Sequence, residues 1–336
     1  MANSHSLFPI SHFLIPTVQR ILLVKTSSLG DVVHNLPVAS DIRAAVPGAQ
    51  IDWVVEESLA AIPRLHPAVS RVLPVAIRRW RSSLLDGGTR TELRAFVSGL
   101  RQTTYDSVID TQGLLKSALM AYAARGIRHG LDFASAREPL SFFYDRTYAV
   151  PWTMHAVERN RRLAAQALGY AVPADLDYGV SAPPASFVWL PGGRHAVLAH
   201  ATSASAKLWP EGRWTELGLR LGERGVRSVL PWGSTAERLR AEGIARPIPG
   251  AVVAPGLSLA DAAALLAGAD AVIGVDTGLT HLAAALKVPT IGIYCATDPA
   301  ATGLHGCPRA VNLGGIGAPP SVDDVIAMLG QLGGVL

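Results

Sequence analysis

Near the start of the chain, residues 21–36 are ILLVKTSSLGDVVHNL. The apolar run Ile21–Val24 is typical of a buried strand, and a small polar loop at residues 25–31 follows it. Apolar residues then recur at helical spacing as far as Val46, where Pro47-Gly48 ends the pattern. These residues predict a strand, a loop that suits a phosphate group and a helix, which together open a parallel α/β sheet.

The alternation of strands and helices continues along the first half of the chain and restarts in the second half. In the first half, strands are expected near residues 51–55, 72–75, 107–109 and 127–129, with helices at 92–100, 115–124 and 155–168. In the second half, strands are expected at 196–199, 226–230, 252–253, 271–275 and 290–294, with helices beginning near 211, 235, 259 and 277. A stretch rich in proline, glycine and serine at 178–193 separates the halves. This pattern predicts two doubly wound domains whose ligand crevices share one cleft.

Length and composition agree with a two-domain globular protein. The 336 residues are 49% apolar and 17% charged, and such a chain can bury a sizeable core. Its two cysteines give neither a disulfide framework nor metal-ligand spacing, as expected in the cytoplasm. Residues 1–19 contain Pro9 and Pro16 and do not resemble a secretory signal, so we expect a loose extension. No apolar run is long enough to span a bilayer.

The positive charge is concentrated in the first half of the chain. Residues 1–180 hold 19 Lys and Arg against 15 Asp and Glu, whereas the remainder holds 11 of each. Eight arginines lie between residues 64 and 101: Arg64, Arg71, Arg78, Arg79, Arg81, Arg90, Arg94 and Arg101. They indicate either a partner rich in phosphate or carboxylate groups or simply a solvated face, and charge alone does not decide between them.

The loop after the first strand offers one candidate catalytic group. It lacks both the Gly-x-Gly-x-x-Gly pattern of dinucleotide sites and the Gly-Lys-Ser/Thr ending of a P-loop. Asp31 stands at the start of the following helix. A carboxylate there is usually a helix cap, but at the mouth of a crevice it can also act as a general base.

Two loops of the second half are candidate anion sites. Thr202, Ser203 and Lys207 follow a strand and offer hydroxyl donors and a positive charge to a diphosphate, unless the loop is only a serine-rich turn. Val275-Asp276-Thr277-Gly278 joins a strand to a helix whose first N–H groups favour an anion. His281 lies one turn further on and either faces that anion or packs in the core.

Two further groups of acids have competing interpretations. Glu237 follows another strand, where it either accepts hydrogen bonds from a ribose or simply begins a helix. Asp323 and Asp324 are expected to cap a C-terminal helix. No Cys/His cluster, His-Glu-x-x-His pattern or Asp-x-Asp pair ends a strand, so the sequence gives no support to a catalytic metal.

Five segments in this order resemble the heptosyltransferases of glycosyltransferase family 9. They are Lys25-Thr26-Ser27-Ser28-Leu29-Gly30-Asp31, Arg78-Arg79-Trp80-Arg81, Asp110-Thr111-Gln112-Gly113-Leu114-Leu115-Lys116, His200-Ala201-Thr202 through Lys207 to Trp209-Pro210, and Val275-Asp276-Thr277-Gly278. The similarity runs from about Ile21 to about Pro299. It therefore covers both expected domains.

The resemblance implies a GT-B fold of two Rossmann-like domains. Residues 20–180 would bind the acceptor, residues 181–320 would bind the nucleotide sugar, and a C-terminal helix at 321–336 would pack back on the first domain. The implied reaction moves L-glycero-D-manno-heptose from ADP-heptose to the first Kdo of Kdo2-lipid A, with inversion and without a metal ion or other cofactor. In this scheme Asp31 is the base.

The resemblance also implies roles for the remaining candidates. Thr202, Ser203 and Lys207 would hold the diphosphate, with Glu237 near the ribose. Asp276, Thr277, Gly278 and His281 would complete the donor site. The acceptor would meet basic residues, namely Arg78, Arg79, Arg81, Lys116, Arg125, Arg128 and Arg137.

Three alternatives stay open. A sister enzyme would add a later heptose to the core, a nicotinamide-dependent oxidoreductase would use two similar domains, and a nucleotide-sugar sensor would lack catalysis. For the favoured interpretation we expect a monomer in the cytoplasm that binds no nucleic acid. Because its acceptor would be a lipid, peripheral association with the inner membrane through the basic face is a further hypothesis.

Overall fold

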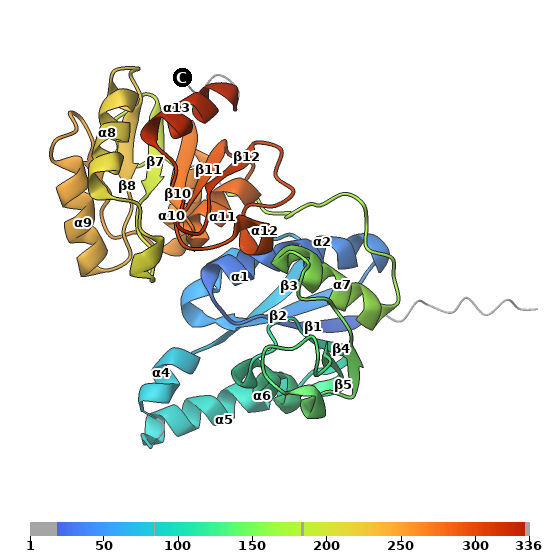
Figure 1. Cartoon of the computed structure of the whole chain (residues 1–336). Helices are drawn as coiled ribbons and strands as arrows, with labels where there is room; N and C mark the ends of the chain where they lie inside the picture. The colour runs from blue at the N-terminus through green and yellow to red at the C-terminus, as the bar shows by residue number, and fades with distance from the viewer. Residues whose placement is uncertain (1–18, 84, 183–184, 333–336) are drawn as a thin grey trace, which may run out of the picture.

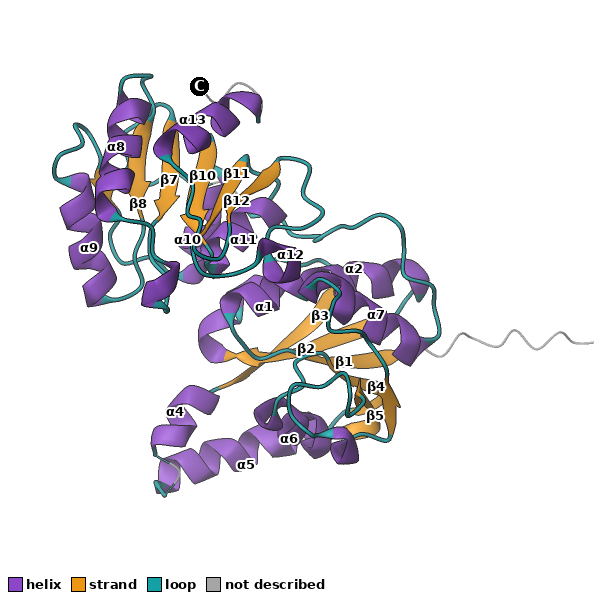
Figure 2. Cartoon of the chain, viewed as in Figure 1, coloured by secondary structure: helices purple, strands orange, loops and turns teal. Residues whose placement is uncertain are grey.

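The computed structural model describes residues 19–83, 85–182 and 185–332. Two six-stranded sheets form the framework, and the strand orders are β3-β2-β1-β4-β5-β6 and β12-β11-β10-β7-β8-β9. All neighbouring strands in both sheets are parallel. Each sheet is covered by helices on both faces, and the two domains meet through helices (Figure 1; Figure 2). The predicted α/β fold with two doubly wound sheets is confirmed.

The first sheet is built from residues 20–148. Its strands are β1 (Arg20–Val24), β2 (Gln50–Glu56), β3 (Val69–Val75), β4 (Thr104–Asp110), β5 (Arg125–Leu131) and β6 (Arg146–Tyr148). The helices are α1 (Leu29–His34), α2 (Leu36–Ala45), α3 (Ala61–Arg64), α4 (Ile77–Ser82), α5 (Gly87–Arg101), α6 (Leu115–Ala123) and α7 (Ala156–Leu168). Single 3₁₀ turns occupy Glu57–Leu59 and Ser141–Phe143. Helices α1, α2 and α7 cover the face toward the second domain, and α5 and α6 cover the other (Figure 2).

The second sheet is built from residues 195–314. Its strands are β7 (His195–Ala199), β8 (Arg227–Leu230), β9 (Val252–Val253), β10 (Ala271–Val275), β11 (Thr290–Tyr294) and β12 (Ala310–Gly314). The helices are α8 (Glu211–Gly222), α9 (Thr235–Ala245), α10 (Leu259–Ala267), α11 (Gly278–Ala285), α12 (Pro299–Thr302) and α13 (Val322–Gln331), and a 3₁₀ turn spans Ser205–Lys207. The segment that joins α7 to β7 contains neither helix nor strand in its described residues.

The two sheets have the same topology, and this places the candidate loops. In each sheet the strand order reverses direction between two adjacent strands, β1 and β4 in the first and β7 and β10 in the second. Ligands of doubly wound sheets bind at such a switch point, beyond the carboxyl ends of the strands. Thr202 and Asp276 lie in the loops that leave β7 and β10, and Asp31 and Lys116 lie in the first turns of the helices that follow β1 and β4.

The domains pack closely where α1 lies against α11. The side chain of Leu29 occupies the space beside Gly278, and a Cβ added to Gly278 would stand 2.3 Å from Leu29 Cγ. Only glycine permits this approach. Apolar side chains of both domains, such as Val33 and Leu282, are fully buried in one shared cluster. The interface therefore fixes where the first-domain loop stands relative to the second domain.

The C-terminal helix was expected to return to the first domain, and that expectation is wrong. Helix α13 packs on α8, β11 and β12 of the second domain, far from the first domain in Figure 1. Val325 and Leu329 are fully buried there in one cluster with Trp214, so the apolar face of the helix is buried against its own domain. Ser321 and Asp324 form the expected cap. The N-terminal extension lies outside the described residues, apart from Gln19.

Candidate active site

A cavity of about 370 Å³ lies between the two domains, and the loops after β1, β7 and β10 line it together with the start of α9. Its walls bring together the predicted base and every predicted donor-binding residue: Asp31, Thr202, Ser203, Lys207, Glu237, Asp276, Thr277, Gly278 and His281. These residues are separated by up to 250 positions in the sequence. Their convergence follows from the shared topology of the two sheets.

Asp31 is half-buried on α1, and its two oxygen atoms have different surroundings. Oδ2 accepts hydrogen bonds from the Ser28 backbone N–H at 2.7 Å and from Ser28 Oγ at 2.9 Å. This is the helix cap that the sequence allowed. Within the described chain, Oδ1 receives no hydrogen bond from another residue. Asp31 is thus both a cap and a carboxylate with one oxygen free to accept a proton.

Asp276 is the centre of the polar network on the second domain. Lys207 Nζ lies 2.7 Å from Oδ2, Thr297 Oγ1 donates to the same oxygen at 2.8 Å, and His281 Nε2 lies 3.3 Å from Oδ1. Burial alone would raise the pKa of Asp276, but the hydrogen bonds from His281, Lys207 and Thr297 outweigh it and hold the pKa well below its usual value. The carboxylate therefore stays ionised and fixes Lys207 and His281 at the cavity wall.

The amino end of α11 supplies a second group of hydrogen-bond donors for an anion. Thr277 is its N-cap residue, and no side chain caps the helix there. The first N–H groups of a helix lack partners inside the helix and carry a partial positive charge. Thr277 and Gly278 line the cavity, so this charge lies beside Lys207. The arrangement suits a diphosphate group.

A hollow of about 470 Å³ adjoins the cavity on the second domain. It shares Leu29, Glu237 and Thr277 with the cavity and continues between apolar groups that include Trp232, Leu257 and Leu279. Glu237 Oε2 accepts a hydrogen bond from the Gly233 N–H at 2.7 Å. A flat apolar hollow with an acid at its mouth can hold a purine base with a ribose beside the carboxylate.

On the other side of Asp31, a hollow of about 250 Å³ lies within the first domain. Asp31 and Thr302 line both this hollow and the central cavity. Its cations are Lys25, Arg137 and Arg159, and the Arg159 guanidinium stacks over Trp152 at 3.6 Å. Arg159 Nε is buried and has no hydrogen-bond partner among the residues that the structure describes. Such a hollow suits an anionic ligand whose hydroxyl would face Asp31.

The predicted acceptor-binding residues do not form a single group. Arg137 lines the hollow beside Asp31, and Lys116 hydrogen-bonds Ser27 Oγ in the loop that precedes Asp31. Arg81 and Lys116 border an apolar groove between α4, α5 and α6. Arg79 is held by Glu57 and Glu92, whereas the side chain of the exposed Arg78 forms no ion pair with any residue that the structure describes.

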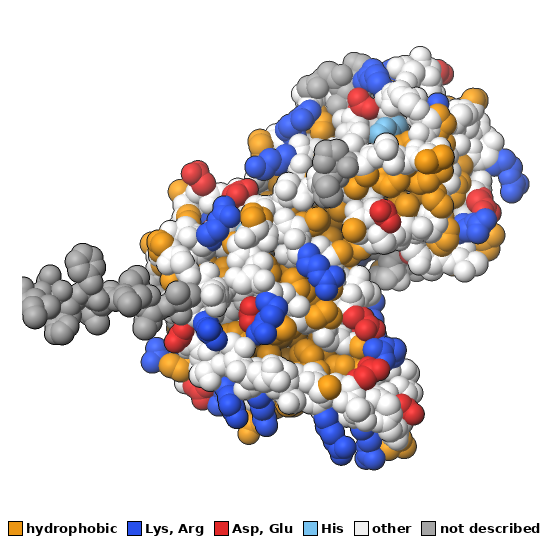
Figure 3. All heavy atoms as spheres, turned by 180° about the vertical axis from the view of Figure 1, so that it is seen from behind, with side chains coloured by type: hydrophobic (Ala, Val, Ile, Leu, Met, Phe, Trp, Pro, Cys, Tyr) orange, Lys and Arg blue, Asp and Glu red, His pale blue; other side chains and the backbone are white. Residues whose placement is uncertain are grey.

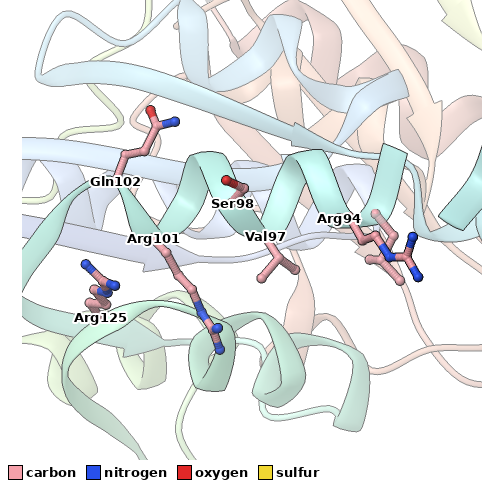
Figure 4. Close-up of a pocket in the computed structure, with 7 residues that line it drawn as sticks. Arg94, Val97, Ser98, Arg101, Gln102 and Arg125 are labelled. Atoms are coloured by element: carbon pink, nitrogen blue, oxygen red, sulfur yellow. The ribbon is translucent and has the colours of Figure 1, made fainter. Parts of the chain in front are cut away.

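Two of the predicted acceptor-binding residues lie away from Asp31. Arg125 begins β5, and Figure 4 shows it near Arg101, the last residue of α5, and Gln102, in a separate surface hollow. Arg128 is ion-paired to Asp145 at 2.6 Å and lies over the Tyr122 ring. The structure therefore does not bring these two residues to Asp31, and their contact with the acceptor stays a prediction. The reason is that ligands gather at the carboxyl end of β5, whereas both residues lie in its first four positions.

Sequence reasoning missed several residues that line the site. Lys25 is only 7% exposed, and its Nζ donates to the Thr111 carbonyl at 2.9 Å. Burial lowers the pKa of Lys25, although Asp31 and Asp110 oppose that effect. A lysine directly after four apolar strand residues was the signal for it. His34, Arg159, Thr297 and Thr302 carried no local signal, because only the tertiary fold brings them to the site.

Two facing doubly wound domains, with a free carboxylate on one and an anion site on the other, define a GT-B glycosyltransferase. The profile of glycosyltransferase family 9 (heptosyltransferase) matches residues 93–323. Lipopolysaccharide heptosyltransferase 1 of Pseudomonas aeruginosa is 53% identical over 290 residues, which cover 85% of this chain and 81% of that protein. The chain therefore belongs to glycosyltransferase family 9.

Solved structures agree with this assignment. The structure of E. coli heptosyltransferase WaaC with ADP has a TM-score of 0.86 at 42% identity, covering 94% of this chain and 100% of that chain. The same enzyme with ADP-2-deoxy-2-fluoro heptose has a TM-score of 0.82 and covers 93% and 99%. No described helix is both long and apolar enough to cross a membrane.

Proposed function

We propose that the protein transfers L-glycero-D-manno-heptose from ADP-heptose to the first Kdo of Kdo2-lipid A, with inversion at the anomeric carbon and without a metal ion. The observation that carries this proposal is the position of Asp31. It lines both the central cavity, which suits a diphosphate, and the cationic hollow, which suits an acidic acceptor. The ADP and the ADP-2-deoxy-2-fluoro heptose named with the similar E. coli structures support ADP-heptose as the donor.

The chemistry follows from the groups at the site. An acceptor hydroxyl is a poor nucleophile at neutral pH, so Asp31 accepts its proton as the new bond to the anomeric carbon forms. The bond from that carbon to the diphosphate breaks, and negative charge builds on the departing ADP. The α11 N–H groups, the hydroxyls of Thr202 and Ser203 and the Lys207 ammonium stabilise this charge. In this scheme the hydroxyl attacks from the side opposite the departing diphosphate, and such an attack inverts the configuration at that carbon.

An apolar groove supports a lipid as the acceptor. It has a volume of about 600 Å³, and its walls include Trp80, Leu93, Leu119 and Met120. Leu114 lines both this groove and the cationic hollow, so the two adjoin. An acidic sugar bound near Asp31 would then extend its apolar part into the groove, where burial of hydrocarbon is favourable.

The basic face supports a loose membrane association. Lys and Arg side chains gather along the lower edge of the first domain in Figure 3, and Arg90, Arg94 and Arg101 are exposed on α5. Anionic lipids attract such residues over about one Debye length. We expect binding to vesicles that contain phosphatidylglycerol to fall as salt rises from about 0.05 to 0.5 M. Binding that is unchanged by salt would argue against an electrostatic association.

The deciding experiment is a transfer assay with ADP-heptose, Kdo2-lipid A and EDTA. We expect a monoheptosylated product with inverted anomeric configuration at an undiminished rate in EDTA. Activity only on an acceptor that already carries heptose would instead identify the sister enzyme. Loss of activity in EDTA, with recovery on added Mg²⁺, would contradict the metal-independent mechanism. Retention of NAD without binding of ADP would favour an oxidoreductase.

A further inference from the structure

His34 connects the helix that carries Asp31 to the anion site of the other domain. It is the last residue of α1 and is 4% exposed. Its Nε2 lies 3.2 Å from Nδ1 of His281, and the two rings meet edge to face with centroids 4.6 Å apart. The other nitrogen of His281 lies against Asp276. A continuous polar chain therefore runs from α1 to Asp276 and Lys207.

The ionised Asp276 fixes one hydrogen position in this chain. The ionised Asp276 carboxylate can only accept, so His281 Nε2–H donates to it. The Nδ1 of His281 and the Nε2 of His34 share the hydrogen bond between the two rings, and either nitrogen can be its donor, depending on the tautomer. Burial, followed by the charges of His281 and His155, lowers the pKa of His34 well below its usual value, so His34 stays neutral. It takes part in the hydrogen bond to His281 without adding a positive charge beside Lys25.

The neighbouring contacts make this connection sensitive to the position of α1. A Cβ added to Gly30 would lie 3.4 Å from His281 Cδ2, so the imidazole packs directly on the α1 backbone. His34 follows Asp31 by three residues, which places the two side chains on neighbouring positions of one helical face. A shift of α1 that breaks the hydrogen bond between the two histidines therefore also moves the Asp31 carboxylate relative to Asp276.

We propose that His34 is a positioning residue: its hydrogen bond to His281 sets the register between the Asp31 carboxylate and the diphosphate site of the second domain. This inference rests on the proposed function. His34 touches no reacting atom in this scheme. It acts through His281, which lines the cavity and orients Asp276, and through α1, which carries Asp31.

The test compares His34→Leu with His34→Gln in the full chain. Leucine fills similar space without a donor, whereas the glutamine amide can place an N–H near the position of Nε2. We expect His34→Leu to lower kcat of heptose transfer by 10- to 100-fold, with the dissociation constant for ADP changed less than threefold. His34→Gln should recover most of the kcat. The Nε2 signal of His281 in ¹⁵N NMR should shift in His34→Leu and return toward the wild-type position in His34→Gln.

A control separates positioning from simple loss of packing. His66 is also buried, and it is hydrogen-bonded to Ser40. It lines neither the central cavity nor the two hollows that adjoin this cavity. His66→Leu should lower Tm with little change in kcat. Equal losses of kcat in the His34 and His66 variants, or an unchanged kcat in His34→Leu, would overturn the inference. A wild-type protein that transfers no heptose would instead overturn the proposed function.

Discussion

Asp31 illustrates how one side chain combines a structural and a chemical task. Its Oδ2 completes the cap of α1 through Ser28, and its Oδ1 is left for the proton of a substrate. Asparagine can keep the first interaction, because its carbonyl oxygen also accepts from a backbone N–H, but it is not a base. The two tasks can therefore be separated by a single substitution.

Asp31→Asn should lower kcat for heptose transfer by about 10²- to 10⁴-fold, the usual contribution of a general base. ADP binding, followed by calorimetry, should stay within about threefold of wild type, since the donor site is on the other domain. Asp324→Asn is the matched control, because Ser321 and Asp324 form the same capping arrangement away from the cleft. Unchanged turnover in Asp31→Asn would remove the base from the mechanism.

Lys207 should contribute mainly to the binding of the diphosphate. Its ammonium is held by Asp276 at 2.7 Å, so little further ordering is needed for it to bind an anion. We expect Lys207→Met to weaken ADP binding by roughly 10- to 100-fold, the range of a charge-assisted hydrogen bond. Lys287→Met is the control, because Lys287 pairs with Asp177 on an exposed surface. Equal ADP affinity in the two variants would contradict the assignment of Lys207.

At the scale of elements, the contact between α1 and α11 depends on small groups. Gly278→Ala should force the helices apart because its Cβ would overlap the Leu29 side chain. We expect kcat to fall at least tenfold, and Leu29→Ala in the same chain should recover part of it in a double-mutant cycle. Gly212→Ala should have no such effect, because a Cβ there meets open space. Strictly additive effects would show that this contact does not govern catalysis.

The sequence predicted the elements whose signals are local. The strand, loop and helix around Asp31 were expected from periodicity, although Asn35 and Pro37 divide the expected helix into α1 and α2. Strands β6 and β12 were not expected. They lie at the edges of their sheets, where partial exposure weakens the apolar run that marks a strand.

The candidate site was predictable only in part, for a related reason. Residues in the loops after β1, β7 and β10 have recognisable neighbours in sequence, and they do line the cavity. By contrast, His34 meets His281 across 247 positions of sequence. Arg128 is engaged by Asp145 and Arg79 by Glu92, and charge counting could not distinguish such pairs from arginines available to a ligand.

At the scale of the whole molecule, buried histidines make the fold sensitive to acid. Burial lowers the pKa of His66, His129, His155 and His200 from 6.5 to about 4. Between these values the unfolded chain binds more protons than the folded protein, so the free energy of unfolding falls as the pH falls from about 6.5 to 4. Stability should be nearly constant above pH 7.

Urea unfolding at pH 7.5, 6.0 and 5.0 tests this expectation. Each such histidine can contribute a slope of up to about 1.4 kcal/mol per pH unit within that window. His200→Leu should reduce the slope, since His200 is fully buried and burial is the largest cause of its lowered pKa. A free energy of unfolding that is independent of pH between 7 and 5 would contradict this account.

The location of α13 has a consequence for how such an enzyme can change. Because this helix stays on its own sheet, the described chain passes between the halves along one connection, residues 169–194. A hybrid that joins the first half of this protein to the second half of a relative would need only one junction. Recognition of the two substrates could then diverge separately in evolution or be recombined by design.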